Sequence, residues 1–314
     1  MMNLCRNILI VGSNGQDGQV LQEILKEENA SIFRKNRNTV ISPNGKKYIN
    51  IEGNNLKSIF LSNDIDEVYF LAATNFSASQ TTIHSTQAEV KLQLDLLINE
   101  LIELLEIIHI NSPKTKIFFA SSALVFGNTS AYPQDEMTLT EPTEIYALFK
   151  VLCQEVLFYY RNKFDLFIVI GILYPHESEF RKPEFLFPTI IHHAYLAKSG
   201  HATKLEIVDL DFRREWNCAY QVMQACVDSL RLKIPDNYIV GSGIQYSVSE
   251  ICSIVFGQFD LNFENFVFKS SQIIRERNPN LIANPVKLFN ALGSVPDGNA
   301  ESLIQRVFNK LGYR

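Results

Sequence analysis

The feature that most constrains this chain is a glycine-rich turn that directly follows a short apolar strand. From Asn7 the chain reads NILIVGSNGQDG, which places Gly12, Gly15 and Gly18 at three-residue intervals. The next stretch, VLQEIL, has apolar residues at helical spacing, so the pattern predicts a strand, a tight turn and a helix. Glycine allows the turn and a close backbone approach, and the first N–H groups of a helix attract anions. The segment therefore predicts a cradle for a dinucleotide pyrophosphate; the alternative is a structural turn in an unrelated α/β protein.

A basic run after the second expected strand bears on the choice of dinucleotide. After residues 30–33 the chain reads RKNR, with no Asp or Glu where an acidic side chain would bind the ribose 2′-hydroxyl of NAD. Arg34, Lys35 and Arg37 would instead suit a 2′-phosphate. The run therefore predicts NADP, with NAD as the alternative cofactor and a solvated basic loop as the alternative interpretation.

Three residues in the middle of the chain are suited to proton transfer. Tyr146 and Lys150 lie four apart in IYALFK, which puts both on one face of a helix. A nearby ammonium favours the phenolate, so we expect Lys150 to lower the pKa of Tyr146. The Ser122 hydroxyl, in ASSALVFG, is the expected hydrogen-bonding companion. The alternative is a buried aromatic residue beside a solvated lysine.

Composition excludes several other classes of protein. The formal net charge of −5 argues against non-specific nucleic-acid binding. The longest apolar stretch, residues 166–174, is too short to span a bilayer, and the first strand leaves no room for a signal peptide. Five scattered cysteines without CxxC spacing indicate neither structural zinc nor a disulfide framework. We expect a cytoplasmic protein with no metal and no nucleic-acid or membrane partner.

Strand-like and helical segments alternate through the first half of the chain. Strands are expected at residues 7–12, 30–33, 67–72, 115–120 and 166–172. This alternation predicts an α/β fold, a Rossmann-like doubly wound parallel sheet with helices on both faces. Ligands bind at the carboxyl ends of such strands, where Gly12, Leu71 and Ser122 fall, so one cleft is expected. The predicted division is a dinucleotide-binding domain of residues 1–172 and 208–240, and a smaller C-terminal substrate-binding lobe of residues 173–207 and 241–314.

Two expected helices carry apolar residues on more than one face. They cover residues 89–110 and 146–161, and the first contains Leu97, Leu101 and Leu104. A helix with a single buried stripe does not need so many apolar residues. Either both helices are deeply buried in the monomer, or they pack against a second copy. We expect a homodimer, with a tetramer as the alternative.

Four stretches together resemble the extended short-chain dehydrogenase/reductase superfamily, and within it the GDP-mannose 4,6-dehydratase family. They are GSNGQDG from Gly12, GILYPHES from Gly171, RREW from Arg213 and GIQYSV from Gly243. The resemblance implies an NAD(P)-dependent epimerase, dehydratase or reductase that acts on a nucleotide-diphosphate sugar, with a GDP-sugar favoured. It implies the following sites: catalytic Ser122, Tyr146 and Lys150; cofactor-binding Gly12, Asn14, Gly15, Gln16, Asp17, Gly18, Arg34, Lys35, Leu71, Ala72 and Ala73; and substrate-binding Glu177, Arg214 and Arg277.

One departure from the family pattern bears on the reaction. Dehydratases of this family carry a Glu two positions after the catalytic hydroxyl residue, and this chain has Leu124 there. Leucine cannot move a proton, so hydride transfer at hexose C4 with 4-keto reduction or epimerisation is the favoured interpretation. A true 4,6-dehydratase would need a substitute acid/base, for which Glu144 and Asp135 are the candidates. The third alternative is a non-catalytic NADP-binding protein.

Overall fold

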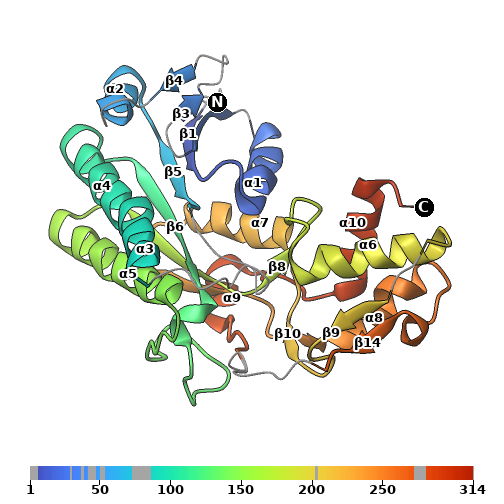
Figure 1. Ribbon diagram of the computed structural model, residues 1–314. Helices are drawn as coiled ribbons and strands as arrows, with labels where there is room; N and C mark the ends of the chain where they lie inside the picture. Colours follow the sequence, from blue (N-terminus) through green and yellow to red (C-terminus); the bar gives the residue numbers. More distant parts are fainter. Residues whose placement is uncertain are drawn as a thin grey trace.

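An eight-stranded sheet forms the centre of the larger domain (Figure 1). The computed structural model describes residues 6–28, 30–36, 39–41, 47–49, 54–72, 86–201, 204–271 and 281–313. The sheet strands are β1 (Arg6–Val11), β2 (Ala30–Asn36), β3 (Thr39–Ile41), β4 (Lys47–Ile49), β5 (Glu67–Phe70), β6 (Lys116–Ser122), β7 (Ile168–Leu173) and β12 (Asn237–Val240). Their order is β12-β7-β6-β5-β1-β2-β3-β4. The first six strands in this order are parallel, and β3 and β4 add an antiparallel edge.

Helices cover both faces of the sheet, which confirms the predicted α/β class (Figure 1). One face packs against α2 (Asn54–Ser62), α4 (Glu100–Asn111) and α5 (Ile145–Phe164), and α3 (Thr86–Gln93) packs against α5. The other packs against α1 (Gln16–Lys26), α7 (Ala219–Ser229) and α9 (Val286–Leu292). Because both faces are covered, the central strands are mostly apolar, and every residue of β5 and β7 is buried.

The smaller lobe has its own hydrophobic core. It contains α6 (Leu186–Lys198), α8 (Val248–Gly257) and α10 (Ala300–Leu311), which pack around the buried Trp216. Short strand pairs complete it: β9 (Leu205–Ile207) with β14 (Val267–Lys269), and β10 (Arg213–Glu215) with β13 (Gln245–Ser247). A third pair, β8 (His176–Glu177) and β11 (Asn217–Cys218), lies where the lobe meets the sheet domain. Within the described residues, no helix is both long enough and apolar enough to cross a bilayer.

Two contacts differ from the expected division into domains. The segment 208–240, expected in the sheet domain, contains β10, which pairs with β13 from the segment expected in the lobe. Conversely, α9 lies in the segment expected in the lobe, yet it contacts α7 and β12, and its Leu288 is buried in the core of the sheet domain. The two differences have different causes: β10 joins the lobe by backbone pairing with β13, whereas α9 joins the sheet domain by burying Leu288.

The bounds of three expected elements differ from the prediction. The second strand runs to Asn36 rather than residue 33, because parallel pairing with β1 continues through Lys35. The helix expected at 89–110 is a composite of α3, a π-helical segment η2 (Leu94–Asn99) and α4. The helix expected at 146–161 is the longer α5. The other strand predictions are correct to within three residues.

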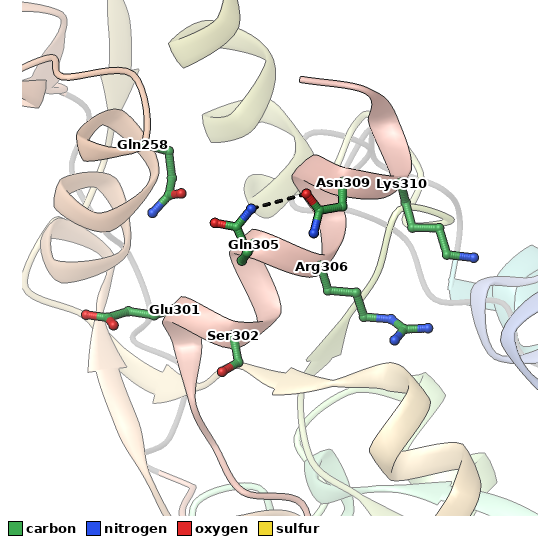
Figure 2. Close-up of a pocket in the computed structure, with 7 residues that line it drawn as sticks. All are labelled: Gln258, Glu301, Ser302, Gln305, Arg306, Asn309 and Lys310. Carbon is green, nitrogen blue, oxygen red and sulfur yellow. Dashed lines mark hydrogen bonds between the residues drawn. The ribbon is translucent and has the colours of Figure 1, made fainter. Parts of the chain in front are cut away.

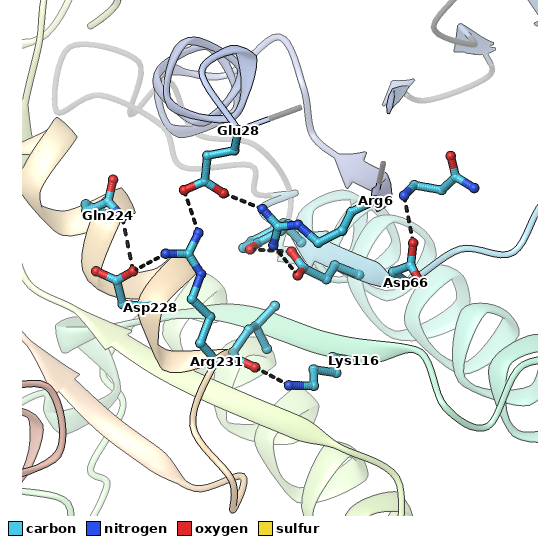
Figure 3. A network of polar contacts seen from close by, with 11 residues as sticks. Arg6, Glu28, Asp66, Lys116, Gln224, Asp228 and Arg231 are labelled. Atoms are coloured by element: carbon cyan, nitrogen blue, oxygen red, sulfur yellow. Dashed lines mark hydrogen bonds and ion pairs between the residues drawn. The ribbon is translucent and has the colours of Figure 1, made fainter. Parts of the chain in front are cut away.

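A network of charges holds together the amino ends of the strands (Figure 3). Arg6, the first residue of β1, pairs with Glu28 after α1 and, at 2.5 Å, with Glu67 at the start of β5. Arg231 after α7 also pairs with Glu28, at 2.5 Å. The network lies at the end of the sheet opposite the glycine turn, so it serves the assembly of the sheet.

Candidate active site

The glycine turn is built by contact with a neighbouring strand end. Gly12 has φ +89°, a conformation that side chains rarely adopt, and a Cβ there would lie 2.8 Å from the Ala72 nitrogen and 2.9 Å from the Leu71 carbonyl carbon. A Cβ on Gly18 would lie 2.5 Å from the Gly12 oxygen. These two glycines therefore let β1, α1 and the end of β5 meet. Leu71 and Ala72 lie beside the turn, as predicted for residues lining one cleft.

The start of α1 remains open for an anion. Gly15 is the N-cap residue and provides no side-chain cap, and a Cβ on it would meet only the Gly12 oxygen, at 3.4 Å. The Asn14 carbonyl accepts a hydrogen bond from Gln19, which keeps the Asn14 backbone in the turn. The first N–H groups of α1 therefore suit a pyrophosphate, both by their direction and by the positive end of the helix dipole.

Gln16 and Asp17 join the glycine turn to β8. The Gln16 amide donates to the His176 carbonyl oxygen at 3.1 Å, and Asp17 Oδ1 lies 2.8 Å from His176 Nε2. Burial opposes both charges, but the pair still raises the pKa of His176 and lowers that of Asp17. The sequence predicts a cofactor-binding role for Asp17 and no role for His176. The polar run PHES, which follows a fully apolar strand, is the sequence feature that could have indicated His176 as a site residue.

Ser122, Tyr146 and Lys150 come together at the carboxyl ends of β5 and β6. Ser122 is the last residue of β6, and its hydroxyl is hydrogen-bonded to the buried Tyr146. The Lys150 ammonium donates to the carbonyl oxygens of Ala120, at 2.7 Å, and Ala72, at 3.3 Å. It also lies 5.7 Å from the centre of the Tyr146 ring. The predicted juxtaposition of these three side chains is present.

The electrostatics of this cluster differ from the prediction. Burial raises the pKa of Tyr146 well above its usual value, and the negative charge of Asp17 raises it further, while the hydrogen bond from Ser122 lowers it. Burial also lowers the pKa of Lys150 to about 8. The pKa of Tyr146 is therefore raised rather than lowered as predicted, because desolvation of the phenolate is the largest effect on it.

The two basic residues of β2 have different surroundings. Arg34 is half-buried and makes no ion pair among the described residues. The Lys35 ammonium is buried and lies 2.7 Å from the Glu100 carboxylate on α4. This contact differs from the expected role of Lys35 at a 2′-phosphate, because its charge already has a carboxylate partner. Arg37 lies outside the described residues.

An arginine from the lobe reaches the sheet domain through Glu177. Arg214 on β10 donates to Glu177 Oε1 at 2.6 Å and stacks on the Trp216 ring, with its guanidinium carbon 4.3 Å from the ring centre. Arg181 lies 3.4 Å from the other Glu177 oxygen. Glu177 thus positions two guanidinium groups, of which sequence reasoning identified only Arg214. Ala73 and Arg277, also predicted site residues, lie outside the described residues.

Comparison with known proteins places these observations in a family. The family profile described as GDP-mannose 4,6 dehydratase matches residues 9–305. The chain belongs to the GDP-mannose 4,6 dehydratase family. GDP-mannose 4,6 dehydratase 2 of Arabidopsis thaliana is 28% identical, over 96% of this chain and 86% of that protein. The predicted superfamily and enzyme class are confirmed at this level.

Solved structures support the fold alone. UDP-N-acetylglucosamine 4-epimerase from Methanobrevibacter ruminantium M1, in complex with UDP-N-acetylmuramic acid, superposes with a TM-score of 0.81 at 17% identity, covering 98% of each chain. RMD from Pseudomonas aeruginosa, complexed with NADPH, superposes with a TM-score of 0.79 at 16% identity, covering 97% of each. This overall agreement covers the lobe as well as the sheet.

The position of the family's acidic residue is visible in the structure. Leu124 lies half-buried in the short 3-10 helix η3 (Ala123–Phe126), and its N–H donates to the Ser122 hydroxyl at 3.3 Å. Of the two substitute candidates, Asp135 accepts hydrogen bonds from Met137 and Thr138 in its own loop. Glu144 is exposed at the N-cap of α5. The Asp135 carboxylate is thus engaged within its own loop, and the Glu144 side chain does not cap α5.

A hollow on the lobe lies apart from this cluster (Figure 2). Polar and charged side chains of α10, together with Gln258 after α8, line it. It is a shallow surface depression with no residue of the glycine turn or of the Ser122 cluster. Among the described residues, no three His, Cys, Asp or Glu side chains are arranged to hold a metal ion.

We predict that Gly12→Ala destabilises the protein by about 2–4 kcal/mol, because the new Cβ would strain a positive φ and press on the backbone of Leu71 and Ala72. Urea unfolding followed by circular dichroism measures the change. Gly257→Ala is the matched control, since its Cβ meets nothing within 4 Å; it should alter stability by less than about 1 kcal/mol. Equal effects of the two changes would contradict the packing argument.

Proposed function

We propose that this protein is an NADP-dependent enzyme of nucleotide-sugar metabolism that transfers hydride at hexose C4, with 4-keto reduction or epimerisation favoured. The observation that carries the proposal is the convergence of Ser122, Tyr146 and Lys150 beside an open glycine turn. Membership of the GDP-mannose 4,6 dehydratase family supports a GDP-sugar as the substrate.

The glycine turn and Arg34 fit the proposed cofactor. The first turn of α1 would hold the pyrophosphate, and Arg34 would pair with the 2′-phosphate through charge-assisted hydrogen bonds. NADP supplies the hydride chemistry when bound. NAD is the alternative cofactor, and the preference between the two depends on the charges around β2.

The protonation state of Tyr146 supports reduction. Its raised pKa keeps the hydroxyl protonated across the physiological range, and a protonated phenol can donate to the oxygen of a carbonyl that is being reduced. Ser122 would hydrogen-bond the same sugar oxygen and fix its distance from Tyr146. Lys150 holds the ends of β5 and β6 together and would bind the ribose next to the nicotinamide.

The lobe supplies groups for the diphosphate of the sugar nucleotide. Arg214, placed by Glu177 and by the Trp216 ring, carries a planar guanidinium suited to two phosphate oxygens. Arg277 is proposed as the second such residue from its position in the sequence. Because Arg214 comes from the lobe and Tyr146 from the sheet domain, the substrate would bridge the two.

The alternative reaction is 4,6-dehydration, which family membership favours. It needs a group that removes a proton from C5 of a 4-keto sugar, and Leu124 stands where the family carries a glutamate. The loop contacts of Asp135 and the exposure of Glu144 give neither candidate an evident route to the substrate. The reaction without elimination is therefore the better fit to these side chains.

We also propose a homodimer formed through the outer face of α5 and the adjoining helices. Leu148, Leu152 and Tyr159 are 45%, 42% and 55% exposed and form one stripe along α5. Val90 and Leu94, on the helices packed against α5, extend the apolar surface. A second copy of the same surface would bury these side chains, as a two-fold symmetric interface requires.

We predict that Tyr146→Phe lowers kcat by about 10²–10⁴-fold, the usual contribution of a positioned acid or base, while NADPH still binds. Turnover of the sugar nucleotide and fluorescence titration of NADPH measure the two effects. Tyr195→Phe is the control, since Tyr195 stacks on Tyr313 in the lobe. Full activity of the Tyr146 variant would remove the catalytic assignment.

The reaction is tested by mass spectrometry in two incubations: GDP-mannose with NADP⁺, which can accept hydride from C4, and its 4-keto-6-deoxy derivative with NADPH, which can donate hydride. We expect the protein to add two hydrogens to the keto sugar and to leave GDP-mannose intact. The Leu124→Glu variant should acquire the ability to remove water from GDP-mannose. The Leu124→Gln variant, whose side chain has the same shape but no acid, should not.

Loss of water catalysed by the unaltered protein would instead establish a dehydratase with a different acid/base. A protein that binds NADPH tightly but changes neither substrate would point first to other sugar nucleotides and to epimerisation. If the protein changes none of these sugar nucleotides, the remaining alternative is a non-catalytic NADP-binding protein.

We predict that light scattering after gel filtration gives twice the 35.8 kDa chain mass. Leu152→Lys should shift the protein towards the monomer, because it places a charge within the apolar interface. Ile234→Lys is the control, an exposed apolar residue in the loop between α7 and β12. A monomeric unaltered protein would rule out the interface.

A further inference from the structure

The alternation of side chains along β2 separates its two basic residues. Phe33 packs in the core beneath α4, and Ile32 packs against the opposite core beneath α1. Since successive side chains of a strand point to opposite faces, Lys35 shares the α4 side with Phe33, and Arg34 shares the α1 side with Ile32. The two cations therefore cannot both extend from β2 in the same direction.

Glu100 holds the cation on the α4 side. The Lys35 ammonium lies 2.7 Å from Glu100 Oε1, and the two side chains are only 6% and 15% exposed. The pair lies directly beside the glycine turn, because the Lys35 carbonyl accepts a hydrogen bond from the Gly12 N–H at 2.9 Å. Burial raises the pKa of Glu100, while the charge of Lys35 opposes this rise.

We propose that Glu100 is a specificity-determining residue for the cofactor: by pairing with Lys35 it withholds this ammonium from a 2′-phosphate, so the preference for NADP over NAD rests on Arg34. The inference rests on the proposed function, since it concerns the same dinucleotide site. Glu100 lies on α4, outside the glycine-rich and basic motifs that indicated the other cofactor residues.

The physical reason is competition between two anions for one ammonium. A 2′-phosphate that reached Lys35 would have to displace the Glu100 carboxylate, and it would also meet the negative charge of that carboxylate. With Glu100 neutral, no carboxylate at this position would compete with the phosphate for a charge-assisted hydrogen bond from the ammonium. NAD has no 2′-phosphate, so its affinity should depend little on Glu100.

The test is the ratio of Kd values for NADH and NADPH, measured by fluorescence titration at one ionic strength. Glu100→Gln should raise this ratio about five- to tenfold, the effect of one added charge-assisted contact. Glu103→Gln is the matched control, an exposed glutamate three residues further along α4. It should leave the ratio unchanged.

Lys35→Met gives an independent measurement that does not depend on the folding of the Glu100 variant. In the otherwise unaltered protein it should change the ratio less than about twofold, whereas Arg34→Ala should lower it strongly. In the Glu100→Gln background, Lys35→Met should abolish the increase in the ratio of Kd values. Circular dichroism and thermal unfolding confirm that each variant is folded.

Two results would overturn the inference while leaving the proposed function intact: an unchanged ratio in folded Glu100→Gln, or a large loss of NADPH preference in Lys35→Met alone. A protein that binds neither cofactor would overturn the proposed function and this inference together.

Discussion

The site depends on the burial of the Lys150 ammonium between two strand ends. The ammonium donates to the carbonyl oxygens of Ala72 and Ala120, which follow β5 and lie within β6. The pairing of β5 with β6 ends at Phe70 and Phe119, so the ammonium joins the two strands just beyond their last pair. The burial lowers the pKa of Lys150 to about 8, and the same removal from water raises that of Tyr146. One packing arrangement thus fixes the strand ends and the protonation of the proposed acid.

A second set of contacts joins the glycine turn to the lobe. Asp17 pairs with His176, the next residue is Glu177, and Glu177 binds Arg214 on β10. The turn that would hold the cofactor is therefore linked by three polar side chains to the arginine that would hold the substrate. Because these groups are largely buried, the loss of one partner would leave an unpaired charge, which is costly. The arrangement gives the two halves of the site a defined relative position.

The sequence predicted the class of fold because its signals are local. The glycine spacing after an apolar strand, and the alternation of strand and helix, require no knowledge of distant contacts. Tyr146 and Lys150 were recognisable for the same reason, since four residues make one helical turn. The extent of β2 was not recognisable, because pairing with β1 carries it through Lys35 and pairing with β3 adds Asn36, neither of which local propensity indicates.

Residue types and their spacing along the chain are enough to identify the strand–turn–helix that would hold a dinucleotide, the trio of Ser122, Tyr146 and Lys150, and the absence of an acidic side chain at Leu124. The charges around these residues depend on the fold. Whether Lys35 has a carboxylate partner, whether Tyr146 loses its proton more or less easily, and which residue orients Arg214 depend on groups distant in the sequence. Electrostatic free energies are set by burial and by such neighbours, and neither can be read from the spacing of residues along the chain.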